Sequence, residues 1–141
     1  HGPRNDLTQE YNPMKVAGIL NDLKDKLRSV KGNCDAEVDE TISEFKFQDY
    51  ISRDFNGKKF FFTHGHKYNI ENIPYIDFDI MVYGHIHQGF IQKKEQFIFA
   101  NPGSISLPRC NSSHSYMIID NSYIIIKDID GTELQSYKYI D

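Results

Sequence analysis

Two stretches of the chain, FFTHGHKYN (61–69) and VYGHIHQGF (82–90), share one arrangement, in which an apolar run ends in a cluster of glycine and histidine. Apolar runs rich in aromatic and β-branched residues that stop at such a cluster predict a strand followed by a loop. Loops at strand ends are where side chains from several strands of a sheet converge. These two loops carry four of the six histidines, namely His64, His66, His85 and His87.

Strands are predicted on both sides of these stretches. Asn56-Gly57 is the signal of a type I′ hairpin because both residues tolerate positive φ, and it joins a strand near 47–54 to KKFFFT (58–63). NIPYID (72–77) is interpreted as a loop or a single helical turn. Glycine, proline, asparagine and aspartate separate six more predicted strands: FDIMVY (78–83), GFIQKK (89–94), QFIFA (96–100), SYMIID (115–120), SYIIIKDI (122–129) and ELQSYKYI (133–140).

The N-terminal part predicts one amphipathic helix. Asn12 is a favoured N-cap residue, and Pro13 suits the first helical position. Apolar residues then recur at spacings of four, three and four, which predicts a helix with an apolar stripe on a core: Val16, Leu20, Leu23 and Leu27.

A short strand is predicted next, within RSVKGNCD (28–35) and ending at Gly32. It leaves Asn33, Cys34 and Asp35 on a loop, so polar side chains again follow a strand. We expect Asp35 to orient a neighbouring group or to cap the next segment.

Composition limits the classes of function. A chain of 141 residues, with 39% apolar and 13% aromatic residues, predicts one domain over 1–141. A formal net charge of -4 argues against binding to nucleic acid or to an anionic membrane through a basic surface. Two cysteines are too few for a disulfide framework, and no segment suits a membrane span or a secretory signal, so we expect a cytoplasmic protein.

Histidines in an apolar context are commonly hydrogen-bonded core or rim residues. Four of them in two matching contexts favour metal binding instead, because imidazole is a common transition-metal ligand and His-x-His spacing lets two rings approach one metal or two neighbouring metals. A structural zinc finger is disfavoured, since Cys34 and Cys110 lie far apart in the sequence. An open site with nitrogen and oxygen ligands, of the catalytic kind, is the better interpretation.

Four motifs in this order resemble those of the calcineurin-like metallophosphoesterases, and most closely the YfcE-type bacterial phosphodiesterases: GNCD (32–35), THGH (63–66), YGHIH (83–87) and NPGS (101–104). The opening HGPRN (1–5) is similar to the stretch that follows the Gly-Asp metal motif in that group. The resemblance implies an α/β fold, a four-layer β-sandwich flanked by helices. It also implies that the N-terminal strand-helix-strand with the Asp-x-His and Gly-Asp motifs, roughly 30 to 40 residues, precedes this chain.

The resemblance further implies a ligand set. Asn33, His64 and His85 would hold one divalent metal, and His87 its neighbour. The intact enzyme would bind two ions, with manganese favoured over zinc, nickel or iron, and this chain one or none. Two such ions activate water to hydroxide and neutralise charge on the phosphoryl oxygens.

Other positions carry weaker implied roles. Cys34 stands where many relatives have a histidine that assists the leaving group, so general-acid catalysis by this residue is in doubt. His1, Arg4 and His66 are candidates for substrate contact. NPGS offers backbone donors that could face phosphate, although a plain turn explains it equally well, and His114 is interpreted as an exposed loop residue.

We therefore expect metal-dependent hydrolysis of a small phosphodiester, with an activity that is impaired in this chain. We also expect a homo-oligomer, because loss of a strand exposes apolar surface and an open position in the sheet. One alternative is a non-catalytic protein-interaction scaffold on the same fold, like the retromer subunit, although such a scaffold has no chemical need for Asn33, His64, His85 and His87 together. Another is an anion-binding module without chemistry, which would not explain the paired histidines.

Overall fold

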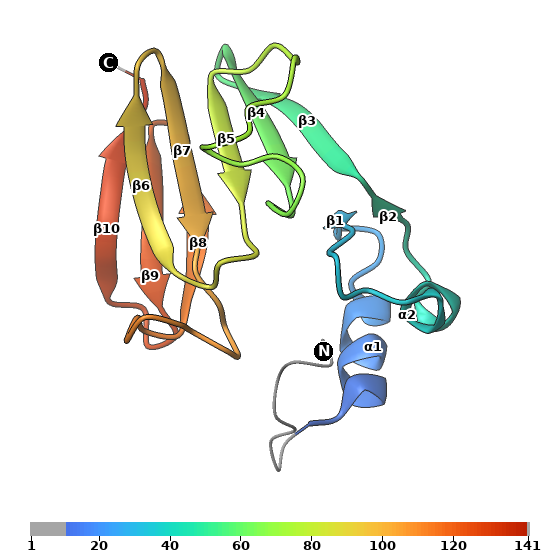
Figure 1. Ribbon diagram of the computed structural model, residues 1–141. Coiled ribbons are helices and arrows are strands. Elements are labelled where there is room, and N and C mark those ends of the chain that lie inside the picture. Colours follow the sequence, from blue (N-terminus) through green and yellow to red (C-terminus); the bar gives the residue numbers. More distant parts are fainter. Residues whose placement is uncertain (1–10, 141) are drawn as a thin grey trace. The chain divides into compact units, whose positions relative to one another are not determined.

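The computed structural model describes residues 11–140, which form two compact units. The N-terminal unit covers residues 11–49 and the sandwich unit residues 50–140, and each is described by itself (Figure 1). The prediction of one domain over 1–141 stays a prediction. No helix among the described residues is long and apolar enough to cross a membrane.

Helix α1 (Pro13–Asp22) begins where the sequence predicts, because the Asn12 side chain accepts a hydrogen bond from the Lys15 N–H at 3.0 Å. The sequence predicted a helix that continues to Leu27 with an apolar stripe on the core, and both of these predictions are wrong. The Lys26 N–H donates to the Leu23 carbonyl at 2.9 Å, and this tight turn replaces the helix before Leu27. Ala17 is the buried helix residue, whereas Val16 is 53% exposed, since adjacent helix positions point about 100° apart.

The rest of the N-terminal unit is a two-stranded sheet with a second helix. β1 (Ser29–Val30) pairs in parallel with β2 (Phe47–Gln48), and β1 stops just before Gly32 as predicted. Helix α2 (Glu37–Ile42) was not predicted. Its signal was the acidic first turn, with Glu37, Asp39 and Glu40, which suits the positive end of a helix dipole.

The sandwich unit contains two sheets. The first has the order β3-β4-β5-β7-β6, with β4, β5 and β7 mutually parallel and both edge strands antiparallel. The second has the order β10-β9-β8 and is antiparallel throughout. The strand bounds are β3 (Tyr50–Phe55), β4 (Lys58–Thr63), β5 (Ile80–Tyr83), β6 (Gly89–Lys94), β7 (Phe97–Pro102), β8 (Ser115–Ile119), β9 (Tyr123–Asp128) and β10 (Glu133–Lys138).

Local turn chemistry sets the register of this unit. Asn56 and Gly57 have φ values of 49° and 78°, so the predicted type I′ hairpin forms and pairs Phe55 with Lys58. Each predicted strand appears within a few residues of its expected bounds, and residues 72–77 form a loop.

The core of the sandwich unit follows from the period-two alternation of strand side chains. One face of the five-stranded sheet presents Phe60, Ile80, Val82, Ile91 and Ala100 to residues of the second sheet and the segment after it, Ile124, Ile126 and Tyr139. The opposite face presents Phe61, Met81, Tyr83 and Phe99, which pack with Phe78. Strands buried on both faces explain the continuous apolar runs in the sequence. The mixed α/β class with a β-sandwich is confirmed.

Candidate functional site

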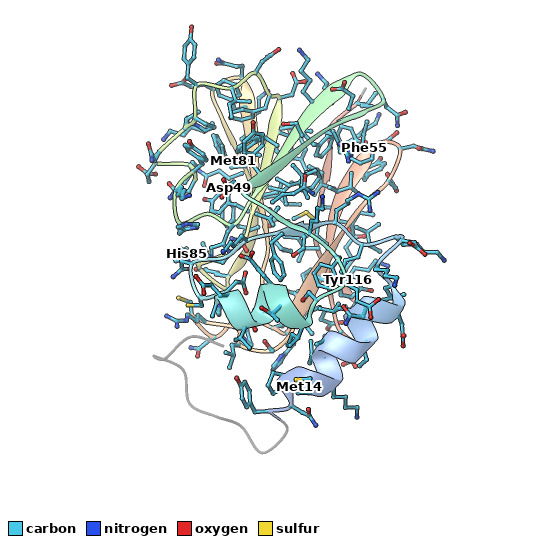
Figure 2. The ribbon with its side chains drawn as sticks, turned by 90° about the vertical axis from the view of Figure 1, so that its right-hand side faces the viewer. Met14, Asp49, Phe55, Met81, His85 and Tyr116 are labelled. Carbon is cyan, nitrogen blue, oxygen red and sulfur yellow. The ribbon has the colours of Figure 1, made fainter. Side chains whose placement is uncertain are left out.

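Three loops lie at one edge of the five-stranded sheet. They follow the carboxyl ends of the parallel strands β4, β5 and β7, which are neighbours in the sheet and whose arrowheads lie at the same end in Figure 1. We call them the first tip (63–66), the second tip (84–87) and the third tip (101–104). His85 comes after the last residue of β5, and Phe55 is the last residue of β3, at the hairpin turn. Figure 2 shows these two labelled residues far apart.

Three imidazoles from the first two tips come together. The ring centroids of His64 and His85 are 5.1 Å apart, those of His64 and His66 5.3 Å, and those of His66 and His85 6.4 Å. His85 Nδ1 lies 3.2 Å from His64 Nε2, so one ring donates a hydrogen bond to the other. We call these three side chains the imidazole cluster. The sequence-based expectation that the two tips converge is met for these residues.

His87 is held separately, by a loop that follows the third tip. Its Nδ1 lies 2.8 Å from the Leu107 carbonyl oxygen, which can only accept, so Nδ1 carries the proton. The other ring nitrogen, Nε2, therefore keeps its lone pair in the neutral imidazole. A histidine oriented in this way through a backbone carbonyl is typical of metal ligands.

The backbone of the second tip is strained at the two residues that carry its imidazole side chains. His85 and His87 have φ values of 66° and 61°, in the left-handed region that residues other than glycine rarely adopt. Gly65 has φ 111°, and a Cβ there would meet Tyr83 Cδ2 at 2.8 Å and His85 Cβ at 3.1 Å. The Gly84 N–H donates to the His64 carbonyl at 3.0 Å. Such strain persists only where the surrounding structure holds it in place, and strained residues cluster at functional sites.

Asn101 ties the third tip to the second. Its side chain is fully buried, and its Nδ2 donates to the Gly84 carbonyl at 2.6 Å, directly before His85. Its Oδ1 accepts from the Gly103 N–H at 2.9 Å. NPGS is thus a turn that positions the second tip, a role that sequence reasoning missed. No sequence pattern reveals this role, because the burial of Asn101 and its hydrogen bond to Gly84 follow from the tertiary structure.

The segment after the third tip is fastened to His87 at several points. The Arg109 N–H donates to the His87 carbonyl at 3.0 Å, and the Ser112 hydroxyl contacts the same carbonyl at 3.4 Å. Cys110 and Asn111 have φ values of 54° and 56°, so a tight turn follows Arg109. Sequence reasoning did not single out Arg109.

Burial lowers the pKa of His85 below its usual range, and electrostatic repulsion from the neighbouring His66, His87 and Arg109 side chains lowers it further. The neutral imidazole, which is the form that binds metals, is therefore favoured at neutral pH.

The remaining predicted residues do not belong to the tips. Asn33 and Cys34 are exposed residues of the N-terminal unit, and Asn33 Nδ2 contacts Cys34 Sγ at 3.6 Å. Asp35 holds their turn, since its Oδ2 accepts from the Gly32 N–H at 2.6 Å. His114 is exposed, with Nδ1 2.6 Å from the Ile105 carbonyl oxygen. His1 and Arg4 lie outside the described residues.

The donor set of the tips fits a divalent transition metal. Among residues 11–140, no group of three or more histidine, cysteine, aspartate or glutamate side chains is arranged around one point as a metal site. The tips nevertheless bring the His64 and His85 rings into contact, and the Leu107 carbonyl orients the His87 ring so that its other nitrogen can act as a ligand. Imidazole nitrogen donors suit zinc, iron, nickel and copper, and manganese is better served where oxygen ligands complete the site.

Comparison with known proteins places the chain in a family. Residues 10–122 match the model of the calcineurin-like phosphoesterase superfamily domain. Phosphodiesterase YfcE of Escherichia coli is 38% identical over 131 residues, which cover 89% of this chain and 70% of the relative.

Solved structures agree. The structure of YfcE, a phosphoesterase from E. coli, matches with a TM-score of 0.93 and 32% identity, covering 99% of this chain and 79% of that chain. The structure of Vps29 from Entamoeba histolytica in complex with zinc matches with a TM-score of 0.52 and 19% identity, covering 79% of this chain and 68% of that chain. At this identity the match shows a likeness of fold alone. The chain belongs to the calcineurin-like phosphoesterase superfamily.

Proposed function

We propose that this protein hydrolyses small phosphodiesters at a binuclear metal site to which the tips contribute. The observation that carries the proposal is the set of histidines at the carboxyl ends of two adjacent parallel strands, with His64 and His85 in hydrogen-bond contact and His87 Nε2 available as a ligand. Membership in the superfamily and 38% identity to a protein named phosphodiesterase support it.

In this proposal Asn33, His64 and His85 hold one divalent cation and His87 holds the second, with manganese favoured. Divalent cations, when bound, activate water for attack on phosphorus and neutralise charge on the phosphoryl oxygens. The chain's own part is positioning. The Leu107 carbonyl fixes the tautomer of His87, and Asn101 fixes the backbone that leads into His85.

Two further side chains have proposed roles toward the substrate. His66 shares the imidazole cluster, and its exposed ring suits a contact with a phosphate oxygen. Cys34 stands at the position where many relatives of the family carry a histidine that assists the leaving group, so its role toward the leaving group is the weaker of the two. An activated diester needs less protonation of its leaving group than an alkyl monoester, which favours diesters as substrates.

The test is hydrolysis of bis(p-nitrophenyl) phosphate with added Mn²⁺, together with the metal content of the purified protein. This chain is assayed beside a form that also carries the Asp-x-His and Gly-Asp motifs of the family. His85→Asn removes a ligand while asparagine tolerates the positive φ at this position, and His114→Asn is the matched control outside the cluster.

We expect the form that carries both motifs to bind manganese and to turn over. The same form with His85→Asn should lose most of this activity, and with His114→Asn should keep it. Absence of both metal binding and turnover in both forms would refute the enzymatic proposal and favour the scaffold. Self-association also stays a prediction, which light scattering of the purified chain measures directly.

A further inference from the structure

Asn69 connects the first tip to the loop that follows it. Its Nδ2 donates to the Gly65 carbonyl oxygen at 3.0 Å. Its Oδ1 accepts from the N–H groups of Glu71 and Asn72, at 2.9 and 3.1 Å. Because a carbonyl needs a donor and an N–H needs an acceptor, this orientation of the amide satisfies all three partners. One half-buried side chain therefore holds the loop with its oxygen and the first tip with its nitrogen.

The loop from which Asn69 extends is itself well anchored. Asn69 and Asn72 exchange two backbone hydrogen bonds of 3.1 Å across a two-residue turn. The Tyr68 ring meets Phe61 of β4 edge-on, with ring centroids 6.1 Å apart, and both Tyr68 and Ile70 pack on the outer face of the five-stranded sheet. The Asn69 amide is thus presented to the first tip from a fixed support.

The Gly65 carbonyl belongs to the peptide that joins the two histidines of the first tip. Gly65 has φ 111°, and glycine reaches many backbone conformations, so the orientation of the Gly65–His66 peptide needs a partner to define it. Gly65 is buried, whereas His66 is exposed with its ring centroid 5.3 Å from that of His64. A rotation of this peptide would carry the His66 ring away from His64.

We propose that Asn69 is a positioning residue, which fixes the Gly65–His66 peptide and thereby holds His66 beside His64. The inference rests on the proposed function, in which His64 binds metal and His66 contacts the substrate phosphate. His64 precedes the fixed peptide and His66 follows it, so loss of the contact weakens substrate binding more than metal binding. We expect KM to rise by roughly threefold to tenfold, the effect of losing one hydrogen bond, with little change in kcat.

The experiment separates the two contacts of the Asn69 amide. Asn69→Asp keeps an acceptor for the N–H groups of the turn and removes the donor to Gly65. Asn72→Asp is the matched control, because it makes the same chemical change in the same loop, where the Asn72 Nδ2 donates to the Lys67 carbonyl at 2.6 Å, outside the first tip. Asn69→Ser is an uncharged second variant, since serine also supports such a turn.

Two measurements are made beside thermal unfolding. The first is ¹⁵N-¹H NMR of the imidazoles in this chain without metal, at a pH well above the histidine pKa. The second is the KM and kcat for bis(p-nitrophenyl) phosphate, with the Mn²⁺ affinity, in the form that carries both motifs. The His66 resonances should shift and KM should rise in both Asn69 variants, with neither change in Asn72→Asp and with Mn²⁺ affinity unchanged throughout.

Unchanged His66 resonances in both Asn69 variants, shifts no larger than those of Asn72→Asp, or an unchanged KM in an active enzyme would overturn the inference. Unfolding of both Asn69 variants beside a folded Asn72→Asp would also overturn it, because Asn69 would then serve the fold alone. Shifted His66 resonances in a protein that neither binds Mn²⁺ nor hydrolyses the diester support the positioning role and refute the proposed function, so the two failures are distinguishable.

Discussion

Replacing Asn101 by alanine should destabilise the sandwich unit and release the second tip. The substitution removes the partners of the Gly84 carbonyl and the Gly103 N–H, both part-buried. Partial access of water limits each loss to about 1 kcal/mol, and the space left by a fully buried amide adds about 1 kcal/mol more. We expect the free energy of unfolding to fall by about 2 to 4 kcal/mol, against the 5 to 15 kcal/mol that is typical of a domain.

The assay combines urea denaturation with ¹⁵N-¹H NMR of the imidazoles. Asn101→Asp keeps an acceptor for the Gly103 N–H but loses the donor to Gly84, so it should also destabilise. Gln92→Ala, at an exposed position of β6, is the control and should change stability by less than about 0.5 kcal/mol. A loss below 1 kcal/mol in Asn101→Ala, with unchanged His85 resonances, would refute the reasoning that this side chain holds the tip.

Three further predictions concern the same edge of the sheet. Gly65→Ala should cost about 1 to 3 kcal/mol, because its φ is 111° and the added Cβ meets Tyr83 at 2.8 Å; urea unfolding measures this loss. Gly103→Ala should be at least as costly, since its Cβ would lie 2.0 Å from the Ser115 hydroxyl, and a stability equal to that of the parent chain would contradict this placement. The pKa of His85 is lower in the folded chain than the ordinary histidine pKa of about 6.5, so at pH values just below 6.5 the unfolded chain binds more protons than the folded chain. The melting temperature should therefore fall as the pH decreases through 6.5, and it should fall less in His85→Asn.

Features determined by neighbouring residues were predictable from the sequence. The hairpin at Asn56-Gly57 depends on two residues that tolerate positive φ, and the N-cap at Asn12 depends on one side chain and a nearby backbone N–H. The convergence of His64 and His85 was also predictable, because both follow apolar strands and parallel strands end at one edge of a sheet.

Features determined by competing or distant contacts were not predictable. The spacing that ends with Leu23 and Leu27 fits a longer helix, yet a tight turn at Leu23 ends the regular hydrogen bonding of α1. The roles of Asn101 and Arg109 depend on hydrogen bonds to carbonyl groups of the second tip, and no residue pattern reveals backbone acceptors that only the tertiary structure brings near.

The central claim is that the histidines of the tips bind a divalent metal. An Mn²⁺ titration of the form that also carries the Asp-x-His and Gly-Asp motifs, followed by imidazole NMR, tests it most directly. Paramagnetic broadening should affect His64, His85 and His87 at the lowest Mn²⁺ concentrations and leave His114 sharp until excess metal is present. Broadening of all histidines together, or of none at millimolar Mn²⁺, would contradict the account.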